Sequence, residues 1–362
     1  MNVMLFSRII AKSGVGNYMK LLSNELARQG HYVVVVSTNN EMEIGGTERI
    51  IFEKLDNLSK KPIDIIKNIK HLRKIIMTHH IDIVHCHHRM AAFYMRLYNS
   101  FYHIPIVYTL HLADVPCNYI YRKMTFVGDK AMGVSSEVSI FLVDKLKVPK
   151  DKVVTVFNGV EPGGLTPLIV EEKRIVRKKW DIPEGSIVFS LHSRIEEVKN
   201  QLLIVEAVKR LDKEERKKVI ILCSGVKTGE YYKKVMDTIE NYKLKEYFRF
   251  IGWADTREVL GISDFLICPS RNEGFLLTSV EAFFMKIPVF RTETAGFRDQ
   301  KYCFPISMDD PEITTAIMRD IYQNGVEKYY KYVQEAYLYA MENFTVKVMA
   351  EKIVQVYRDV GA

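Results

Sequence analysis

The sequence predicts an α/β protein made of two doubly wound parallel sheets in tandem. Short β-branched runs alternate with longer helical stretches along the 362-residue chain, which is the pattern of parallel strands joined by crossover helices. A segment dense in glycine and proline, residues 158–167, interrupts this pattern where neither helix nor strand continues easily. The length also favours two domains, because a domain has roughly 100–200 residues.

The first domain is predicted over residues 1–160. Its helix 16–28 ends shortly before Gly30, and glycine is a common C-terminal stop because it readily adopts positive φ. The predicted strands cover residues 2–6, 32–37, 50–52, 81–85, 106–109, 130–134 and 153–157.

The second domain is predicted over residues 161–340, and a C-terminal helix over 341–362 is expected to return to the first domain. Strands are predicted at 187–191, 218–223, 248–252, 264–268 and 287–291, and helices at 200–211, 230–241, 256–261 and 278–285. Beyond about Asp309 the chain is predicted to be helical. Two similar halves suggest a cleft between them, because ligands bind such sheets outside the carboxyl ends of the strands.

Composition places the chain among soluble globular proteins. Hydrophobic residues make up 48% and charged residues 27%, which excludes the apolar-poor composition of a disordered chain. No apolar run reaches the roughly 18–20 residues that span a bilayer, and the first residues lack the features of a signal peptide. We therefore expect a cytoplasmic protein. Its five cysteines, an odd number without a CxxC pair, predict reduced thiols.

Positive charge is concentrated in the first half of the chain. The formal net charge is +8, and residues 1–165 account for +7, with 21 Lys and Arg against 14 Asp and Glu. This asymmetry suggests an anionic partner for the first domain, either a membrane surface or an acidic substrate, and simple solubility is the alternative. Nucleic acid is not an expected partner.

Two glycines, Gly14 and Gly16, lie between the first predicted strand and the first helix. Glycines here let the backbone approach an anion at a helix N-terminus, and a tight turn is the structural alternative. A dinucleotide-binding fingerprint is disfavoured, because the third glycine of GxGxxG and an acidic residue after the next strand are missing.

Two cations, Arg194 and Lys199, lie in the loop after strand 187–191. A diphosphate needs such charges, since arginine binds two oxygens through its planar fork and lysine acts as a point charge. Taken alone, a solvated charged loop is the simpler interpretation of these residues.

Segment 269–282 is the most informative part of the sequence. Glu273 lies in the loop after a predicted strand, and Glu281 lies about one turn inside the following helix. Acidic residues near a helix N-terminus can be mere capping or dipole partners. The backbone N–H groups of residues 274–278 would also point at an anion, so that two carboxylates would flank a phosphate-sized site.

With these residues in order, the sequence resembles the retaining glycosyltransferases of family 4, which have the GT-B fold. Glu273 and Glu281, with seven residues between them, match the paired glutamates of that family. The resemblance covers nearly the whole chain. Its other matches are Gly14-x-Gly16, Asp82-Ile-Val-His85 with His87, Thr109-x-His111, Val134-Ser135, Asn158-Gly-Val, Arg194 with Lys199, Phe250-Ile-Gly252, Pro269-Ser270, and Ala282 with Pro288-Val289.

The resemblance implies two Rossmann-like domains that face each other across a cleft, with the acceptor on the first domain and the nucleotide-sugar on the second. It implies that Glu273 and His111 are catalytic residues beside the transferred sugar, and that Glu281 accepts hydrogen bonds from ribose hydroxyls. Trp253 could stack on the nucleobase, or be an ordinary core or surface tryptophan. The donor-binding residues implied are Gly14, Gly16, Arg194, Lys199, Gly252, Trp253, Gly274, Phe275, Leu276, Leu277, Thr278 and Glu281.

Three departures from the family's pattern bear on the donor's identity and leave the reaction class unchanged. Ser193 replaces the glycine that usually precedes the arginine, and Lys286-Ile287 replaces the glycine before Pro288. The glycine-rich loop after the second strand of the donor domain reads Cys223-Ser-Gly-Val-Lys-Thr-Gly229.

A histidine cluster invites a zinc hypothesis. It mixes a loop with a strand end, and no acid or thiol completes a site, so the family pattern explains His85 and His87 better. We therefore expect no metal and no cofactor. The histidines concerned are His79, His80, His85, His87 and His88.

The function expected from the resemblance is transfer of a sugar from a nucleotide-sugar, with uridine diphosphate as the expected carrier, to a hydroxyl of a cell-envelope glycan, with retained configuration. The rival hypotheses are a GT-B nucleotide-sugar epimerase, a non-catalytic partner subunit of a transferase complex and, more distantly, a nucleotide-dependent oxidoreductase. The presence of both glutamates and both cations argues against the partner subunit.

A basic amphipathic helix is predicted over residues 60–76. At about 100° per residue, one side is apolar and the other is basic. The apolar side is expected to pack on the first sheet, and the basic side is either simply solvated or bound to anionic lipid on the inner face of the cell membrane, beside a lipid-linked acceptor. The apolar positions are Ile65, Ile69, Leu72 and Ile76, and the basic ones are Lys67, Lys70, His71 and Lys74.

Overall fold

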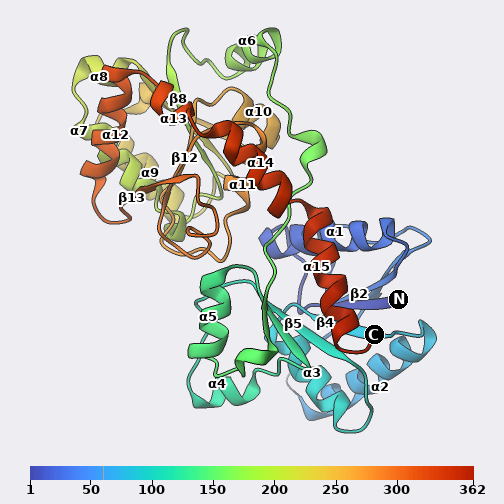
Figure 1. Ribbon diagram of the computed structural model, residues 1–362. Helices are drawn as coiled ribbons and strands as arrows, with labels where there is room; N and C mark the ends of the chain where they lie inside the picture. Colours follow the sequence, from blue (N-terminus) through green and yellow to red (C-terminus); the bar gives the residue numbers. More distant parts are fainter. Residues whose placement is uncertain (60) are drawn as a thin grey trace. The chain divides into compact units, whose positions relative to one another are not determined.

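The computed structural model describes residues 1–59 and 61–362, which form two compact units. The first unit comprises Met1–Glu161 and Asn343–Ala362, and the second comprises Pro162–Glu342. Each unit has a parallel β-sheet with helices packed on both faces (Figure 1). Within the described ranges, no helix combines the length and the apolar character needed to cross a membrane.

The first unit has a seven-stranded sheet in the order β3-β2-β1-β4-β5-β6-β7. The strands are β1 (Asn2–Phe6), β2 (Tyr32–Ser37), β3 (Ile50–Lys54), β4 (Ile83–Cys86), β5 (Ile106–Leu110), β6 (Lys130–Gly133) and β7 (Val153–Thr155). Helices α1 (Gly14–Arg28), α2 (Pro62–Thr78), α3 (Arg89–Asn99), α4 (Tyr119–Met124) and α5 (Ser136–Asp144) belong to the connections. Strand β1 is an inner strand of the sheet, and its Val3 lies opposite Val33 of β2 on one side and Ile83 of β4 on the other.

The C-terminal helix α15 (Val346–Asp359) completes the first unit and packs against α1 (Figure 1). It buries one face, which includes Met349, Ile353 and Tyr357, as the 3.6-residue repeat of an amphipathic helix requires. Backbone hydrogen bonds between Val160 and residues 344 and 346, at 2.9 and 3.0 Å, join it to the end of the first segment.

The second unit has a six-stranded sheet in the order β10-β9-β8-β11-β12-β13. The strands are β8 (Ile187–His192), β9 (Val219–Ser224), β10 (Phe248–Gly252), β11 (Phe265–Cys268), β12 (Val289–Thr292) and β13 (Cys303–Ile306). The helices are α6 (Val170–Lys179), α7 (Gln201–Arg210), α8 (Lys213–Lys217), α9 (Glu230–Asn241), α10 (Thr256–Gly261), α11 (Leu277–Phe284), α12 (Pro311–Asn324), α13 (Glu327–Tyr330) and α14 (Val333–Asn343).

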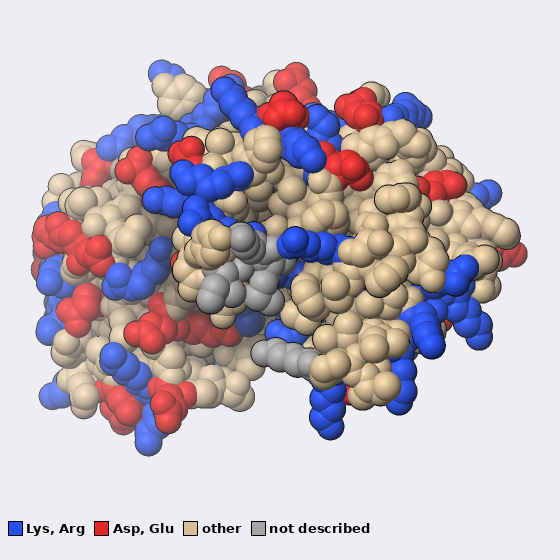
Figure 2. Space-filling view, turned by 90° about the horizontal axis from the view of Figure 1, so that it is seen from below, with Lys and Arg blue, Asp and Glu red and all other residues tan. Residues whose placement is uncertain are grey.

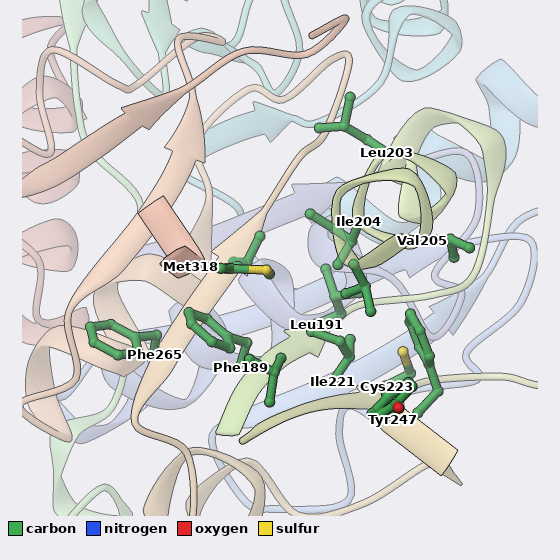
Figure 3. Packing of buried hydrophobic residues seen from close by; sticks show 14 of the residues in the cluster. Phe189, Leu191, Leu203, Ile204, Val205, Ile221, Cys223, Tyr247, Phe265 and Met318 are labelled. Atoms are coloured by element: carbon green, nitrogen blue, oxygen red, sulfur yellow. The ribbon is translucent and has the colours of Figure 1, made fainter. Parts of the chain in front are cut away.

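A core of buried aliphatic and aromatic side chains fills one face of this sheet (Figure 3). Phe189 of β8 stacks on Phe265 of β11 with ring centroids 5.1 Å apart. Ile204 of α7 and Met318 of α12 close the cluster from the helical layer. Because this sheet is covered on both faces, its inner strands are buried along their length and do not alternate between buried and exposed residues, as β9, β11 and β12 show.

The predicted strands all occur in the structure, and their ends coincide with the observed ones or differ by at most two residues. The edge strand β13 is absent from the prediction because Pro305 interrupts its pattern. Proline has no N–H to donate, and an edge strand tolerates it because only one side of the strand is paired. The predicted basic helix corresponds to α2, which begins at Pro62; its expected first residue, Lys60, lies outside the described residues.

Candidate functional site

The strand order reverses direction between β8 and β11 in the second sheet. At such a switch point the two neighbouring loops leave the sheet on opposite sides and open a space at its carboxyl edge. The loops concerned are the one after β8, which holds Arg194 and Lys199, and the one after β11, which holds Glu273. The N–H group of Arg271 donates to the carbonyl of Val198 at 2.8 Å and fixes the two loops side by side.

Lys199 and Glu273 meet at this point. The Nζ atom of Lys199 lies 2.5 Å from Oε1 of Glu273, and the two side chains are 17% and 12% exposed. Both charges are therefore largely withdrawn from water. The attraction between opposite charges is stronger in such a place than on an open surface, because the local dielectric constant is lower.

The N-terminus of α11 follows Glu273 after three residues. Its N-cap is Leu276, whose apolar side chain makes no capping hydrogen bond to the first N–H groups of the helix. Uncapped N–H groups and the positive end of the helix dipole favour an anion. Gly274, Phe275 and Leu276 form the approach to this helix end, and Thr278 contacts Cys268 through its hydroxyl at 3.9 Å from the sulfur. Leu277 is the first residue of the helix.

Glu281 lies one turn further along α11. Burial raises the pKa of its carboxyl to about 7. The folded protein therefore holds a carboxyl group that is only partly ionised at neutral pH and gains from hydrogen-bond donors that stabilise its charged form.

Arg194 does not join the Lys199–Glu273 pair. Its guanidinium lies 2.8 Å from Glu196, and half of its side chain is exposed. The two predicted cations thus differ, since one is held in the buried pair and the other is held at the surface of the same loop.

The carboxyl end of β10 carries Gly252 and Trp253. Gly252 has a φ of +75°, which glycine adopts without strain, and its carbonyl accepts a hydrogen bond of 2.7 Å from Gly225. The indole of Trp253 is 83% exposed. It is therefore a surface tryptophan rather than a core residue.

His192, the last residue of β8, is a titratable residue at the carboxyl edge of the sheet that sequence reasoning did not select. Its Nδ1 contacts the hydroxyl of Ser224, and its Nε2 lies 3.0 Å from the hydroxyl of Thr256. Burial lowers the pKa of the imidazole to about 4, so it is neutral at pH 7. It joins β8, β9 and α10, and its position directly after a buried strand was the available signal.

The first sheet also has a switch point, between β1 and β4. After β1, Ser13 caps α1 by accepting a hydrogen bond of 3.3 Å from the N–H of Gly16. A side chain at Gly16 would overlap the carbonyl oxygen of Ala11, whereas a Cβ at Gly14 would have nothing within 4 Å. Local packing therefore requires glycine at position 16 and leaves position 14 open.

His111 follows β5, next to the end of β4. Its Nε2 lies 3.3 Å from Nδ1 of His87, and Tyr18 packs edge-on against it at 4.8 Å between ring centroids. Burial lowers the pKa of His111 to about 3. The opposite nitrogen of His87, Nε2, is buried and has no hydrogen-bond partner among the described residues. His87 thus joins His111 as a functional candidate.

The five histidines of the zinc hypothesis do not form one site, although the rings of His85 and His87 lie with their centroids 4.0 Å apart. His79 contacts Glu53 at 3.0 Å and Tyr32 at 3.1 Å. His85 is held between the hydroxyls of Thr109 and Tyr357, both at 2.7 Å. Over residues 1–59 and 61–362, no three His, Cys, Asp or Glu side chains converge in a way that could hold a metal ion.

Helix α2 presents its basic residues to solvent. Leu72, Ile75 and Ile76 are buried, whereas the lysines predicted on the opposite side, Lys67, Lys70 and Lys74, are exposed. The exposed side also carries apolar residues that the prediction did not include: Ile63, Ile66 and Met77 are 56%, 52% and 61% exposed.

Comparison with known families identifies both halves of the chain. Residues 12–163 match the model described as Glycosyltransferase Family 4, and residues 172–301 match the model described as Glycosyl transferases group 1. The chain belongs to glycosyltransferase family 4.

Curated relatives of this family 4 chain are distant. An uncharacterised glycosyltransferase of Methanocaldococcus jannaschii is 25% identical over 262 residues, which are 64% of this chain and 66% of the relative. An O-antigen biosynthesis glycosyltransferase, WclY of Escherichia coli, is 23% identical over 59% of this chain and 57% of its own length. The alignments thus span less than two thirds of these relatives.

Solved structures match the family 4 chain along its whole length. A glycosyltransferase from Rickettsia africae has a TM-score of 0.85 at 24% identity and covers 99% of this chain and 98% of its own. Anabaena Alr3699/HepE in complex with UDP has a TM-score of 0.83 at 14% identity, covering 99% and 100%. Together with the two parallel sheets, these matches confirm the predicted GT-B fold.

Proposed function

We propose that this chain transfers a sugar, with retention of anomeric configuration, from a uridine diphosphate sugar to a hydroxyl of a cell-envelope glycan. The observation that carries the proposal is the buried Lys199–Glu273 pair beside the uncapped N-terminus of α11. At one switch point, a cation and a helix dipole can bind a diphosphate, and a carboxylate can bind the hydroxyls of the attached sugar.

Lys199 and the N-terminus of α11 bind the diphosphate. Charge grows on the leaving diphosphate as the bond to the sugar breaks, so these groups stabilise the transition state more than the ground state. The ammonium of Lys199 donates to Oε1 of Glu273 at 2.5 Å. Donor binding exchanges this partner for phosphate oxygens and frees Glu273 to accept hydrogen bonds from the sugar. Arg194 approaches from the surface by giving up Glu196.

Two further groups of the second unit hold the nucleoside. Glu281, in its ionised form, accepts hydrogen bonds from the ribose hydroxyls, and their donation compensates for its burial. Trp253 offers an exposed indole at the end of β10 for stacking on the base. Gly252 has no side chain and so lets the nucleoside come close to the backbone at the end of β10.

The first unit supplies His111 and Gly14. His111 acts as a neutral imidazole, because its pKa of about 3 leaves it unprotonated at physiological pH. It donates or accepts one hydrogen bond at the transferred sugar while His87 holds its other nitrogen. The open space at Gly14 lets a ligand approach the start of α1. We adopt front-face attack within a short-lived ion pair by analogy with the family.

Uridine as the base and an envelope glycan as the acceptor follow from relatives. Alr3699/HepE is described with UDP, and WclY is named for O-antigen biosynthesis. Both are relatives below 25% identity, so they guide the choice of first substrates.

Peripheral attachment to anionic membrane through α2 completes the proposal. Lys67, Lys70 and Lys74 lie on the same exposed side as Ile63 and Ile66. Lysines near an anionic leaflet contribute about 1 kcal/mol each, and apolar side chains between them can enter the interface. Figure 2 shows, at its lower right, Lys and Arg side chains beside uncharged surface with little Asp or Glu.

A thermal-shift panel of nucleoside diphosphates and their sugars tests the donor. We expect UDP and a UDP-sugar to raise the melting temperature, because a ligand stabilises the state that binds it. The shift should survive EDTA, since side chains and a helix terminus supply the positive charge on the diphosphate. Absence of a shift with every nucleotide, or a shift that needs a divalent ion, would contradict the proposal.

A further inference from the structure

Arg291, in the middle of the second sheet, is a buried cation that the proposed chemistry does not use. It lies in β12 between Cys268 of β11 and Pro305 of β13, is fully buried, and is the largest of the fully buried side chains. Among the described residues, no carboxylate forms an ion pair with it. A guanidinium held by neutral acceptors alone is a costly core residue, so its position needs an explanation.

The partners of Arg291 lie in the loop that follows β12. Its Nη2 donates to the hydroxyl of Thr294 at 2.9 Å and to the carbonyl of Ala295 at 3.0 Å. Its Nη1 donates to the side-chain oxygen of Gln300, which is also fully buried. The guanidinium therefore fixes both ends of residues 291–300, which we call the bracing segment.

Gln300 passes this constraint to α11. Its amide nitrogen donates to the carbonyl of Leu276 at 2.8 Å, and Leu276 is the N-cap of α11. One amide thus connects the buried arginine to the residue that sets the direction of the uncapped N–H groups.

Two more contacts hold the bracing segment against the loop after β11. The hydroxyl of Thr292 donates to the carbonyl of Ser270 at 2.5 Å. Gly296 has a φ of +80°, and a Cβ there would lie 3.2 Å from the ring of Phe275. The segment is therefore in close contact with the loop at both ends of residues 270–276.

We propose that Arg291 and Gln300 are positioning residues for the donor diphosphate, which act by fixing the N-terminus of α11 through the carbonyl of Leu276. This inference rests on the proposed function, because it takes the diphosphate to bind at that helix end. Hydrogen-bond donors stabilise an anion most when they are already oriented before it binds.

The fixed charge of Arg291 adds to this effect. The charges of Arg291, Lys199 and Glu273 all act on the pKa of the Cys268 thiol, which burial raises to about 12, so the four groups share one neighbourhood. A permanent cation beneath the site favours an anionic ligand over a neutral one, and it does so without making contact with it.

Two variants and a matched control test the inference. Gln300→Met removes the donor to Leu276, and Thr292→Val removes the hydroxyl that holds Ser270 while keeping the shape of the side chain. Thr315→Val is the control, because the buried Thr315 hydroxyl also bonds two carbonyls, of Ala207 and Pro311, elsewhere in the same unit. UDP, ADP and GDP are titrated by calorimetry, and hydrogen exchange is followed in peptides that cover residues 274–284.

The nucleoside diphosphate that wild type binds should bind about tenfold more weakly to Gln300→Met and about threefold more weakly to Thr292→Val. The first amides of α11 should exchange faster in both. Thr315→Val should lose thermal stability and keep its affinity within about twofold.

Should Gln300→Met fail to fold, Thr292→Val decides the question by the same readouts. Unchanged nucleotide affinity in Gln300→Met, or in Thr292→Val where Gln300→Met does not fold, would overturn the positioning role and leave the donor site standing. An equal loss of nucleotide affinity in the control Thr315→Val would do the same. Wild type that binds none of the three nucleotides would overturn the proposed function and this inference together.

Discussion

In the proposed donor site, Glu281 is the residue whose protonation would link pH to donor binding. Burial raises the pKa of its carboxyl to about 7, and ribose hydroxyls need the ionised form as acceptor. The affinity for UDP should therefore rise between pH 6 and pH 8 by about tenfold or less. In Glu281→Gln the affinity should be weaker and should follow the titration of UDP alone. Calorimetry across this range checks the prediction, and identical pH profiles for both proteins would refute it.

The same carboxyl should lower stability at high pH. Folding raises the pKa of this carboxyl. Its contribution to the free energy of unfolding is therefore fully present below the unfolded pKa near 4.5 and is lost as the pH rises through about 7. Glu281→Gln should be more stable than wild type at pH 8 by about 2–3 kcal/mol and about equally stable at pH 4. Urea denaturation at the two pH values measures this, and a variant less stable than wild type at pH 8 would contradict the burial argument.

Gly14 and Gly16 form a matched pair, because one glycine is required by packing and the other is not. Gly16→Ala should destabilise the protein by about 1–3 kcal/mol, since its methyl group would overlap the carbonyl of Ala11. Gly14→Ala should fold normally and reduce transferase activity. Chemical denaturation and sugar-transfer assays separate the two effects, and full activity in Gly14→Ala would remove this residue from the site.

The residue types of the site were predictable from sequence, whereas their contacts were not. Glu273 and Lys199 could be selected from their place after strands. Their contact joins residues 74 positions apart and depends on the strand order. The ion pair of Arg194 with Glu196 is a local side-chain contact that no periodic pattern in the sequence indicates. Arg291 was missed because charge in a strand does not by itself indicate burial.

Helix α2 is the element that carries the membrane proposal. Changing Lys67, Lys70 and Lys74 together to Glu should abolish co-sedimentation with anionic vesicles, and the wild type should not pellet with neutral ones. The control changes Lys213, Lys217 and Lys218, exposed lysines of the second unit, to Glu with the same change in charge. Donor binding should be unaffected in both. Equal pelleting of wild type and the α2 variant would make the basic side ordinary solvated surface.

Elements with a strong apolar period were predictable, and those without one were not. The burial of Leu72 and Ile76 on α2 followed from the 3.6-residue repeat. The exposure of Ile63 and Ile66 was not predicted, because an apolar residue type does not by itself show whether another element of the fold covers the side chain. Strand β13 lacked a readable pattern because Pro305 lies in it, and its pairing with β12 decides its structure.

At the scale of the whole molecule, two sheets with one switch point each hold the candidate residues at their carboxyl edges. The alternation of strands and helices predicted both sheets, since covered parallel strands are continuously apolar. Strand order is set by tertiary packing and has no sequence period, so the meeting of the loops after β8 and β11 needed the structure. Val160 and Val346 show how the last helix joins the first unit through backbone pairing.

In the proposed mechanism, Lys199 and Glu273 serve one bound donor in different ways, since Lys199 binds the diphosphate and Glu273 binds the sugar. Calorimetry with UDP on wild type, Lys199→Ala and Glu273→Gln tests it most directly. We predict that Lys199→Ala loses about 1–3 kcal/mol of binding free energy, the range for a charge-assisted hydrogen bond. Glu273→Gln should keep its affinity for UDP or bind it more tightly, because Lys199 is no longer held by a carboxylate, while its sugar transfer is lost. Equal loss of UDP affinity in both variants, or no loss in Lys199→Ala, would contradict the account.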